Sequence, residues 1–273
     1  MPSKIITEEL KQNIINYYLS YPMTLSQVEK HFDLSHPTIS KILKNTPKYP
    51  KAKINNPELK ERFFQTIDNE EKAYFLGLLI ADGNVFKDST GGRQASISIT
   101  LGLEDEYMLL KFKEVLNANT SIGYDGRGCG QIAIRSNLMA IDLEQYGVIP
   151  RKSLFTYLPH IDDKYMNHLI RGILDGDGSI RAEQTQVNNR FAHYIGFCGN
   201  EQLMQDISNY CIKLNLNTVP KVHTYNDKNL SDIKIQSKDD MYIFGEWLYK
   251  DATIFLKRKK DKYELFKSHY NLK

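Results

Sequence analysis

One apolar segment of this chain occurs twice, and each copy ends in an aspartate followed by a glycine. The first copy, Phe75–Gly83, reads Phe-Leu-Gly-Leu-Leu-Ile-Ala-Asp-Gly, and the second, Ile170–Gly178, reads Ile-Arg-Gly-Ile-Leu-Asp-Gly-Asp-Gly. Each predicts a largely buried helix. Small residues lie four positions apart in both copies, so they share one helix face, and such a face lets a second helix approach closely. The two segments are therefore expected to pack against each other.

This packing would bring two acids together. Gly77 and Gly172 are expected at the helix interface, and Asp82 and Asp177 follow directly where the helices end. A carboxylate at a helix C-terminus meets the negative end of the macrodipole, so two of them side by side need a cation. Mg²⁺ fits best, because it prefers oxygen ligands and shares carboxylates with substrate phosphates; Mn²⁺ or Ca²⁺ could replace it. The carbonyls that precede the acids, of Ala81 and Gly176, are candidate additional ligands.

From residue 58 onward the chain repeats one plan. After Asp82, strands are predicted near Val85, at Arg93–Leu101 and at Gln131–Arg135, with helices at Asp105–Leu116 and Asn137–Tyr146. After Asp177, strands are predicted near Ile180, at Ala192–Cys198 and at Asp232–Gln236, with helices at Glu201–Leu214 and Lys238–Tyr249. The pattern predicts an α+β fold of two αββαβ-type repeats related by a pseudo-two-fold axis.

The N-terminal segment has a different character. Helical spacing after Thr7, a second helix from Thr24, a short turn at Asp33–Ser35 and a third apolar helical face predict a helix-turn-helix. A small helical bundle without a role in DNA binding is the alternative. The predicted organisation is a helix-turn-helix domain at 1–46, a basic extended linker at 47–57, and repeats at 58–157 and 158–273.

Composition narrows the class of protein. The 273 residues carry a net charge of only +3, which does not by itself identify nucleic acid as the partner. However, residues 1–60 hold nine lysines against five acidic side chains. No apolar run is long enough to span a bilayer, and no secretory signal is recognisable, so we expect a cytoplasmic protein without a membrane partner. Three cysteines without CxxC spacing indicate neither disulfides nor zinc.

Polar side chains alternate with apolar ones in the predicted strands, as in a sheet with one solvated face. Such side chains can hold phosphates and read base edges, although any half-exposed sheet shows the same alternation. The candidate DNA-binding residues of the helix-turn-helix, the linker and the strands are His36, Thr38, Ser40, Lys41, Lys44, Lys48, Lys51, Lys53, Gln94, Ser96, Ser98, Thr100, Gln131, Arg135, Arg190, Lys234 and Gln236.

The two repeated segments resemble the paired motif of the LAGLIDADG homing endonuclease family in its single-chain, two-repeat form. The resemblance covers about residues 70 to 265. It implies a saddle of two sheets on DNA and makes Asp82 and Asp177 the metal-binding acids. The family also places a basic residue near each site, in a turn before the last helices. Lys152 and Lys259 match it, with Lys257 competing for the second place.

The first copy departs from the motif at Ile80, where the family often has an acid that is not the metal ligand. A polar residue that the family often places near each metal has no clear counterpart; Leu101 or Leu103, and Gly199 or Asn200, fall in that region.

The resemblance implies a magnesium-dependent, site-specific double-strand DNA endonuclease, monomeric on a long asymmetric target, with a role in intron homing and a bacterial or phage origin. Two alternatives share the fold: a catalytically silent transcription regulator and an RNA maturase. Retention of both acids argues against the regulator.

Overall fold

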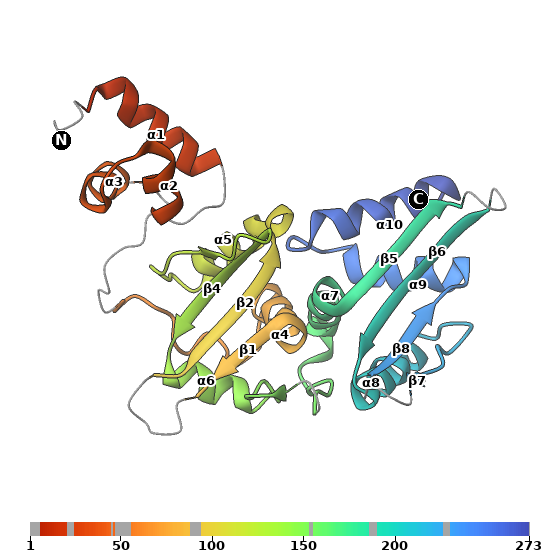
Figure 1. Ribbon diagram of the computed structural model, residues 1–273. Coiled ribbons are helices and arrows are strands. Elements are labelled where there is room, and N and C mark those ends of the chain that lie inside the picture. Colours follow the sequence, from red (N-terminus) through yellow and green to blue (C-terminus); the bar gives the residue numbers. More distant parts are fainter. Residues whose placement is uncertain are drawn as a thin grey trace. The chain divides into compact units, whose positions relative to one another are not determined.

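The structure of the chain is a computed structural model that describes residues 6–20, 25–44, 46, 56–87, 94–152, 155–185, 190–225 and 230–272. Internal contacts divide the chain into two compact units, residues 1–60 with 98–134 and residues 61–97 with 135–273. Helices and strands follow one another as expected of the α+β class, which is confirmed (Figure 1). The predicted linker at 47–57 lies almost entirely outside the described residues.

Three short helices form the N-terminal part. They are α1 (Glu8–Ser20), α2 (Leu25–Phe32) and α3 (His36–Leu43). Their shared core consists of Ile14, Tyr18, Val28, Ile39 and Leu43. The Leu10 amide donates to the Thr7 hydroxyl at 3.2 Å, so Thr7 caps α1. Asp33, in the turn between α2 and α3, has a φ of 49°, a left-handed conformation that Asp tolerates better than most residues.

The remainder consists of two halves whose described helices and strands follow the same order, except that the second half ends in an additional helix, α10. The first half contains α4 (Glu70–Asp82), β1 (Gly83–Phe86), β2 (Ser96–Gly102), α5 (Glu106–Val115), β3 (Gly123–Tyr124), β4 (Cys129–Arg135) and α6 (Asn137–Glu144). The second half contains α7 (Met166–Asp177), β5 (Gly178–Gln184), β6 (Phe191–Gly199), α8 (Glu201–Lys213), β7 (His223–Tyr225), β8 (Leu230–Ile235), α9 (Lys238–Tyr249) and α10 (Lys257–His269).

Each half forms a four-stranded sheet. The strand orders are β1-β2-β4-β3 and β5-β6-β8-β7, which are equivalent. The predicted αββαβ plan therefore lacks one short strand per half, β3 or β7. Neither has the apolar alternation that identifies a strand, because Gly123–Tyr124 has two residues and His223–Tyr225 is exposed throughout. None of the described helices is long and apolar enough to cross a membrane.

The helices α4 and α7 pack against each other along their lengths and supply much of the buried core. Eight successive residues of α4, Ala73–Ile80, are buried. A Cβ on Gly77 would lie 2.0 Å from the Leu169 carbonyl oxygen, and one on Gly172 would lie 2.1 Å from that of Tyr74. The two backbones are thus in direct contact, at a distance that only glycine permits. Figure 1 shows α4 and α7 side by side, each leading into a strand.

Substituting one of the contact glycines tests this packing. Gly172→Ala is expected to lower the free energy of unfolding by about 3 kcal/mol, the upper part of the usual range for overpacking, because backbone atoms cannot move aside cheaply. Gly102→Ala is the control, since the nearest atom to its Cβ would be 3.9 Å away. Chemical denaturation measures both. Equal stability of the two variants would contradict the close backbone contact.

Candidate active site at the ends of two packed helices

The contact of α4 with α7 places two carboxylates next to each other. Asp82 ends α4 and Asp177 ends α7, and each is followed by a glycine that starts a strand. The Asp82 carboxylate oxygen Oδ2 lies 3.2 Å from the position that a Cβ on Gly176 would occupy, so it reaches across to the end of α7. The sheet strands β1 and β5 leave from the same two points.

Both acids titrate abnormally. Partial burial, followed by repulsion from Asp177, raises the pKa of Asp82 to about 6. The pKa of Asp177 is also raised by burial. Although the residue is exposed by surface area, neighbouring protein atoms exclude part of the water around its carboxylate. The lysines Lys152 and Lys259 act in the opposite direction on both groups. Burial therefore makes both carboxylates costly to ionise, and the two buried ammonium groups offset only part of that cost.

The two lysines lie where the helices end. Lys152 and Lys259 are both buried, and Lys257 is exposed. The Lys152 Nζ donates to the Ala81 carbonyl at 3.1 Å. Burial lowers the pKa of Lys152, against the pull of the two carboxylates. Lys259, in the first turn of α10, is in a helix and not in the expected turn.

Lys259 is more completely held than Lys152. Its Nζ donates to the carbonyls of Leu174, Asp175 and Gly178 at 2.5, 2.7 and 2.8 Å. An ammonium group has three donors, so these bonds use all of them. Lys259 therefore acts in this arrangement as a fixed positive charge at the end of α7, where cations stabilise a helix.

A solvated sheet face extends from the acids of the second half. On β5, β6 and β8, Ser179, Cys198 and Lys234 alternate with buried residues. Cys198 lies opposite Asp232, and its thiol donates to the Asp177 carbonyl at 3.0 Å. Its pKa is raised by burial and by Asp177. The sequence showed no clear counterpart of the family's polar neighbour, with Gly199 and Asn200 in that region; in the structure the side chain of Cys198 lies beside Asp177.

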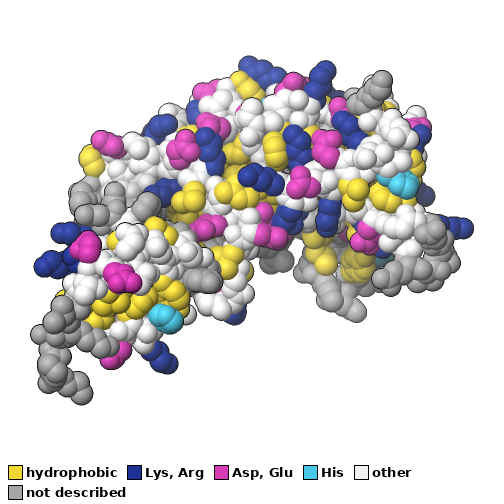
Figure 2. Space-filling view, turned by 90° about the horizontal axis from the view of Figure 1, so that it is seen from above, with side chains coloured by type: hydrophobic (Ala, Val, Ile, Leu, Met, Phe, Trp, Pro, Cys, Tyr) yellow, Lys and Arg dark blue, Asp and Glu magenta, His cyan; other side chains and the backbone are white. Residues whose placement is uncertain are grey.

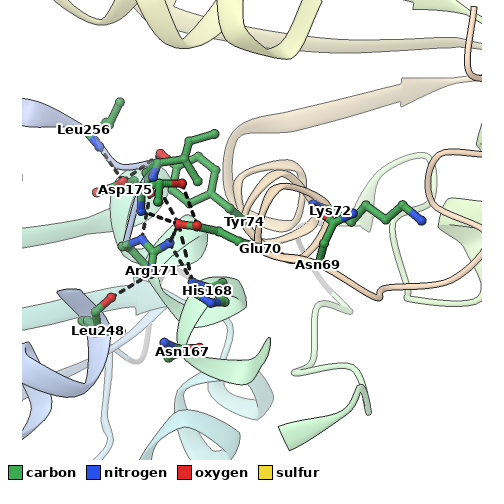
Figure 3. Close-up of polar contacts among 12 residues, drawn as sticks. Asn69, Glu70, Lys72, Tyr74, Asn167, His168, Arg171, Asp175, Leu248 and Leu256 are labelled. Atoms are coloured by element: carbon green, nitrogen blue, oxygen red, sulfur yellow. Dashed lines mark hydrogen bonds and ion pairs between the residues drawn. The ribbon is translucent and has the colours of Figure 1, made fainter. Parts of the chain in front are cut away.

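A buried polar cluster lies farther along the same helix pair (Figure 3). Arg171 of α7 has no exposed surface and pairs with Glu70 of α4 at 2.7 Å. The Tyr74 hydroxyl donates to Asp175 at 2.7 Å. His168 has a lowered pKa, from burial and from Arg171, so its neutral ring can accept a hydrogen bond from Arg171 at Nδ1, 2.9 Å away. Sequence reasoning missed this cluster, although an Arg and a second Asp inside an apolar helix were a visible signal.

The candidate DNA-binding residues lie in several places. On α3, His36 and Lys41 are exposed, as is Lys44 at its C-cap, whereas Thr38 and Ser40 are half-buried. Lys48, Lys51 and Lys53 are outside the described residues. Of the strand residues, Gln94, Thr100, Gln131, Arg135, Arg190, Lys234 and Gln236 are exposed, and Ser96 is half-buried.

Ser98 requires a correction. It was expected on the solvated face but is only 7% exposed. Its strand, β2, lies between β1 and β4 in the sheet, and a central position limits the exposure of a side chain as short as serine. Gln131 donates to Thr100 at 3.0 Å, so these two expected DNA contacts bond to each other.

Charge is mixed over the visible surface. Figure 2 shows Lys and Arg side chains interspersed with Asp and Glu on the face seen from above. Several of the basic residues are paired, including Lys234 with Asp232 at 3.3 Å and Lys87 with Glu144 at 2.7 Å. The low net charge of the chain therefore reflects a surface on which positive and negative side chains are mixed and partly paired. A nucleic acid that bound such a surface would have to displace these pairs.

No protein-family model matches the sequence, and no curated protein matches it. Solved structures share its fold. They include the meganuclease I-SmaMI bound to uncleavable DNA, with 13% identity, 76% of this chain and 91% of that chain covered, and a TM-score of 0.53. The LAGLIDADG meganuclease I-AabMI bound to uncleaved DNA has 11% identity, coverage of 75% and 91%, and a TM-score of 0.55. I-CpaMI, a LAGLIDADG meganuclease also bound to uncleaved DNA, has 16% identity, coverage of 75% and 92%, and a TM-score of 0.54.

At these identities the likeness establishes the fold. The chain has the single-chain, two-domain fold of LAGLIDADG homing endonucleases, a fold found in DNA endonucleases, and the expected resemblance is confirmed at that level. The matches cover about three quarters of the chain.

The raised pKa of Asp82 gives a pH-dependent prediction. Its folded-state pKa, about 6, exceeds its ordinary value of 3.8, so the ionised carboxyl destabilises the folded protein above pH 6, and the cost falls as the pH drops toward 4. Without divalent metal, Asp82→Asn is expected to stabilise the protein by about 2 kcal/mol near pH 8 and by progressively less in acid. Denaturant titrations across this pH range measure the effect.

Asp163→Asn is the matched control, because Lys213 holds the pKa of that exposed carboxyl below its usual range. Its substitution should not stabilise the protein at any pH. A stability difference between wild type and Asp82→Asn that does not change with pH would refute the electrostatic account of the site.

Proposed function

We propose that the chain is a site-specific double-strand DNA endonuclease that uses a divalent metal ion, and that it acts in homing. One observation carries the proposal: two helix ends each present an aspartate, adjacent and electrostatically strained, with a buried lysine at each end. Stability alone does not call for this arrangement. The similar solved structures are DNA complexes of meganucleases, which supports DNA as the substrate.

The residues present fit a hard cation. The pKa values of Asp82 and Asp177 are raised chiefly by burial, so a bound cation would favour the ionised form of both carboxylates. No group of three His, Cys, Asp and Glu side chains suited to a metal occurs among the described residues, so the two acids would share their ion with carbonyls, water and phosphate. Ala81 and Gly176 offer carbonyls, although that of Ala81 already accepts from Lys152. When bound, Mg²⁺ supplies Lewis-acid polarisation of the phosphodiester and a more acidic water.

The protein groups divide the remaining work. Asp82 and Asp177 would orient the ion, one from each half, which suits a duplex with two strands to be cut. Lys259, whose donors are all used, contributes a fixed charge near the phosphate. Lys152 donates to one carbonyl among the described residues, so it is the better candidate to contact phosphate or solvent directly.

The DNA would be bound by the solvated sheet faces and by α3. Exposed amide and basic side chains on β4 and β8, such as Arg135 and Lys234, suit phosphate and base contacts. His36 and Lys41 of α3, with Lys44 at its C-cap, form the exposed surface that we assign to a groove.

Cleavage tests the function. The protein is incubated with Mg²⁺ and a randomised duplex library, the new ends are sequenced, and the selected target is cloned into a plasmid. Wild type is expected to linearise this plasmid. Asp82→Asn or Asp177→Asn should reduce double-strand cleavage at least about 100-fold while retaining target affinity, because several kcal/mol of charge stabilisation are lost. Full cleavage by either variant would disprove the assignment of the acids.

One control variant and one metal-binding measurement accompany the cleavage assay, and their outcomes separate the alternative functions. Ser179→Ala changes an exposed residue beside Asp177 and should leave metal dependence intact. Magnesium alone should raise the melting temperature of wild type but not of the Asp82→Asn, Asp177→Asn double variant. Tight sequence-specific duplex binding without cleavage or a magnesium effect would instead identify a regulator, and a preference for intron RNA in a gel shift would identify a maturase.

The role of α3 has its own prediction. Replacing Lys41 and Lys44 with alanine is expected to weaken target binding. It should also reduce the slope of log affinity against log salt concentration by the amount expected for the loss of about two phosphate contacts. The control is Lys11→Ala on α1, a lysine paired with Glu8. Filter binding at several salt concentrations measures the slope, and an unchanged slope in the Lys41, Lys44 variant would exclude a groove contact by these residues.

A further inference from the structure

The segment between α9 and α10 is fastened to the helix pair by three buried or half-buried side chains. Arg171 donates through Nε to the Ile254 carbonyl at 2.9 Å and through a terminal nitrogen to that of Leu248 at 2.6 Å. Asp175 accepts from the Leu256 amide at 2.8 Å. Figure 3 shows Arg171 and Asp175 pointing toward Leu248 and Leu256. This segment leads directly into α10, whose third residue is Lys259.

Glu70, the first residue of α4, completes the attachment. Its carboxylate accepts from the Thr253 amide at 2.8 Å, the Thr253 hydroxyl at 2.7 Å and the Ile254 amide at 3.1 Å. The Arg171 ion pair with Glu70 therefore joins α4, α7 and the segment in one network. We call Glu70, Arg171 and Asp175 the latch.

The latch costs folding free energy, because it buries charged side chains. Arg171 is completely buried, and Asp175 is 1% exposed with one carboxylate oxygen that accepts no hydrogen bond from the described residues. Burying such charges costs free energy that apolar side chains would not. The charged side chains fix a position instead: their hydrogen bonds define where the segment, and with it Lys259, must lie.

The latch fastens the segment that precedes Lys259 and has no equivalent for the segment that precedes Lys152 among the described residues. Aligning Asp82 with Asp177 places Leu76 at the position of Arg171 and Ile80 at the position of Asp175. Both are apolar and buried, so neither can fasten the segment that precedes Lys152. The hydrogen bonding of the two lysines differs in the same way: within the described part of the chain, Lys259 donates to three carbonyls and Lys152 to one.

We propose that Glu70, Arg171 and Asp175 are positioning residues that hold Lys259 in place, and that the two cleavage centres therefore depend on different residues. Loosening the latch impairs the cut of one DNA strand and spares the other. The strand-specific part rests on the endonuclease function proposed above, whereas the positioning part does not.

The experiment uses Asp175→Leu in the full chain, with Asp240→Leu as matched control. Asp240 is also 1% exposed and also accepts backbone amides, those of Asn217 and Thr218, but it does not belong to the latch. A duplex target labelled on either strand reports each cut separately. Asp175→Leu is expected to slow the cut of one strand at least about 10-fold and that of the other less than about 3-fold. The slowed strand should be the one that Lys259→Met also slows most, and nicks should accumulate in the other strand.

Milder variants keep the test valid if Asp175→Leu does not fold. Asp175→Asn retains an acceptor for the Leu256 amide, so it should lose much less of the cleavage rate than Asp175→Leu. Thr253→Val removes a single hydrogen bond to Glu70, so it should show the same strand bias in weaker form. Equal slowing of both strands, or an equal bias in Asp240→Leu, would overturn the proposal, because a general loss of stability affects both centres.

Amide hydrogen exchange tests the positioning part without DNA. Thr253, Ile254 and Leu256 are expected to exchange at least about 10-fold faster in Asp175→Leu than in Asp240→Leu. Unchanged protection would refute the latch even for an active nuclease. If wild type cuts no DNA but the exchange result holds, the endonuclease function fails and the latch remains as a positioning device.

Discussion

The contact between the backbones of α4 and α7 is the constraint on which the rest of the structure depends. Gly77 and Gly172 each leave no room for a side chain against a carbonyl oxygen of the other helix. This proximity fixes where both helices end, and both end in an aspartate. The two strands that begin there, β1 and β5, carry the geometry outward into the sheets.

The same closeness creates an electrostatic problem that the protein addresses with lysines. Two carboxylates and the last carbonyls of both helices lie together at the negative ends of two helix dipoles. Lys152 and Lys259 reach the carbonyls from later parts of the chain and bring positive charge to both acids, yet the pKa of Asp82 stays near 6. Two partly buried carboxylates that are costly to ionise, side by side, suit a divalent cation.

The sequence predicted those parts of the fold that follow from local periodicity. The glycine spacing predicted the helix pair, and alternation located β4, β6 and β8 within a few residues. It could not locate β7, whose residues are all exposed, or foresee that Ser98 is buried, because both depend on which strands lie side by side. Apart from His168, the hydrogen-bond partners of Arg171 lie about 80 and 100 residues away, so no local pattern could identify them.

Arg171 also bears on why the two halves share one chain. It lies fully buried on a helix that packs against its counterpart, where the equivalent position holds Leu76. An assembly of two identical subunits would have to place an arginine at both positions or at neither, and two guanidinium groups would then need separate buried acceptors. Covalent linkage of the repeats removes this restriction. Each half can acquire residues that would be intolerable in duplicate, and the two can diverge while the glycine contact between them is kept.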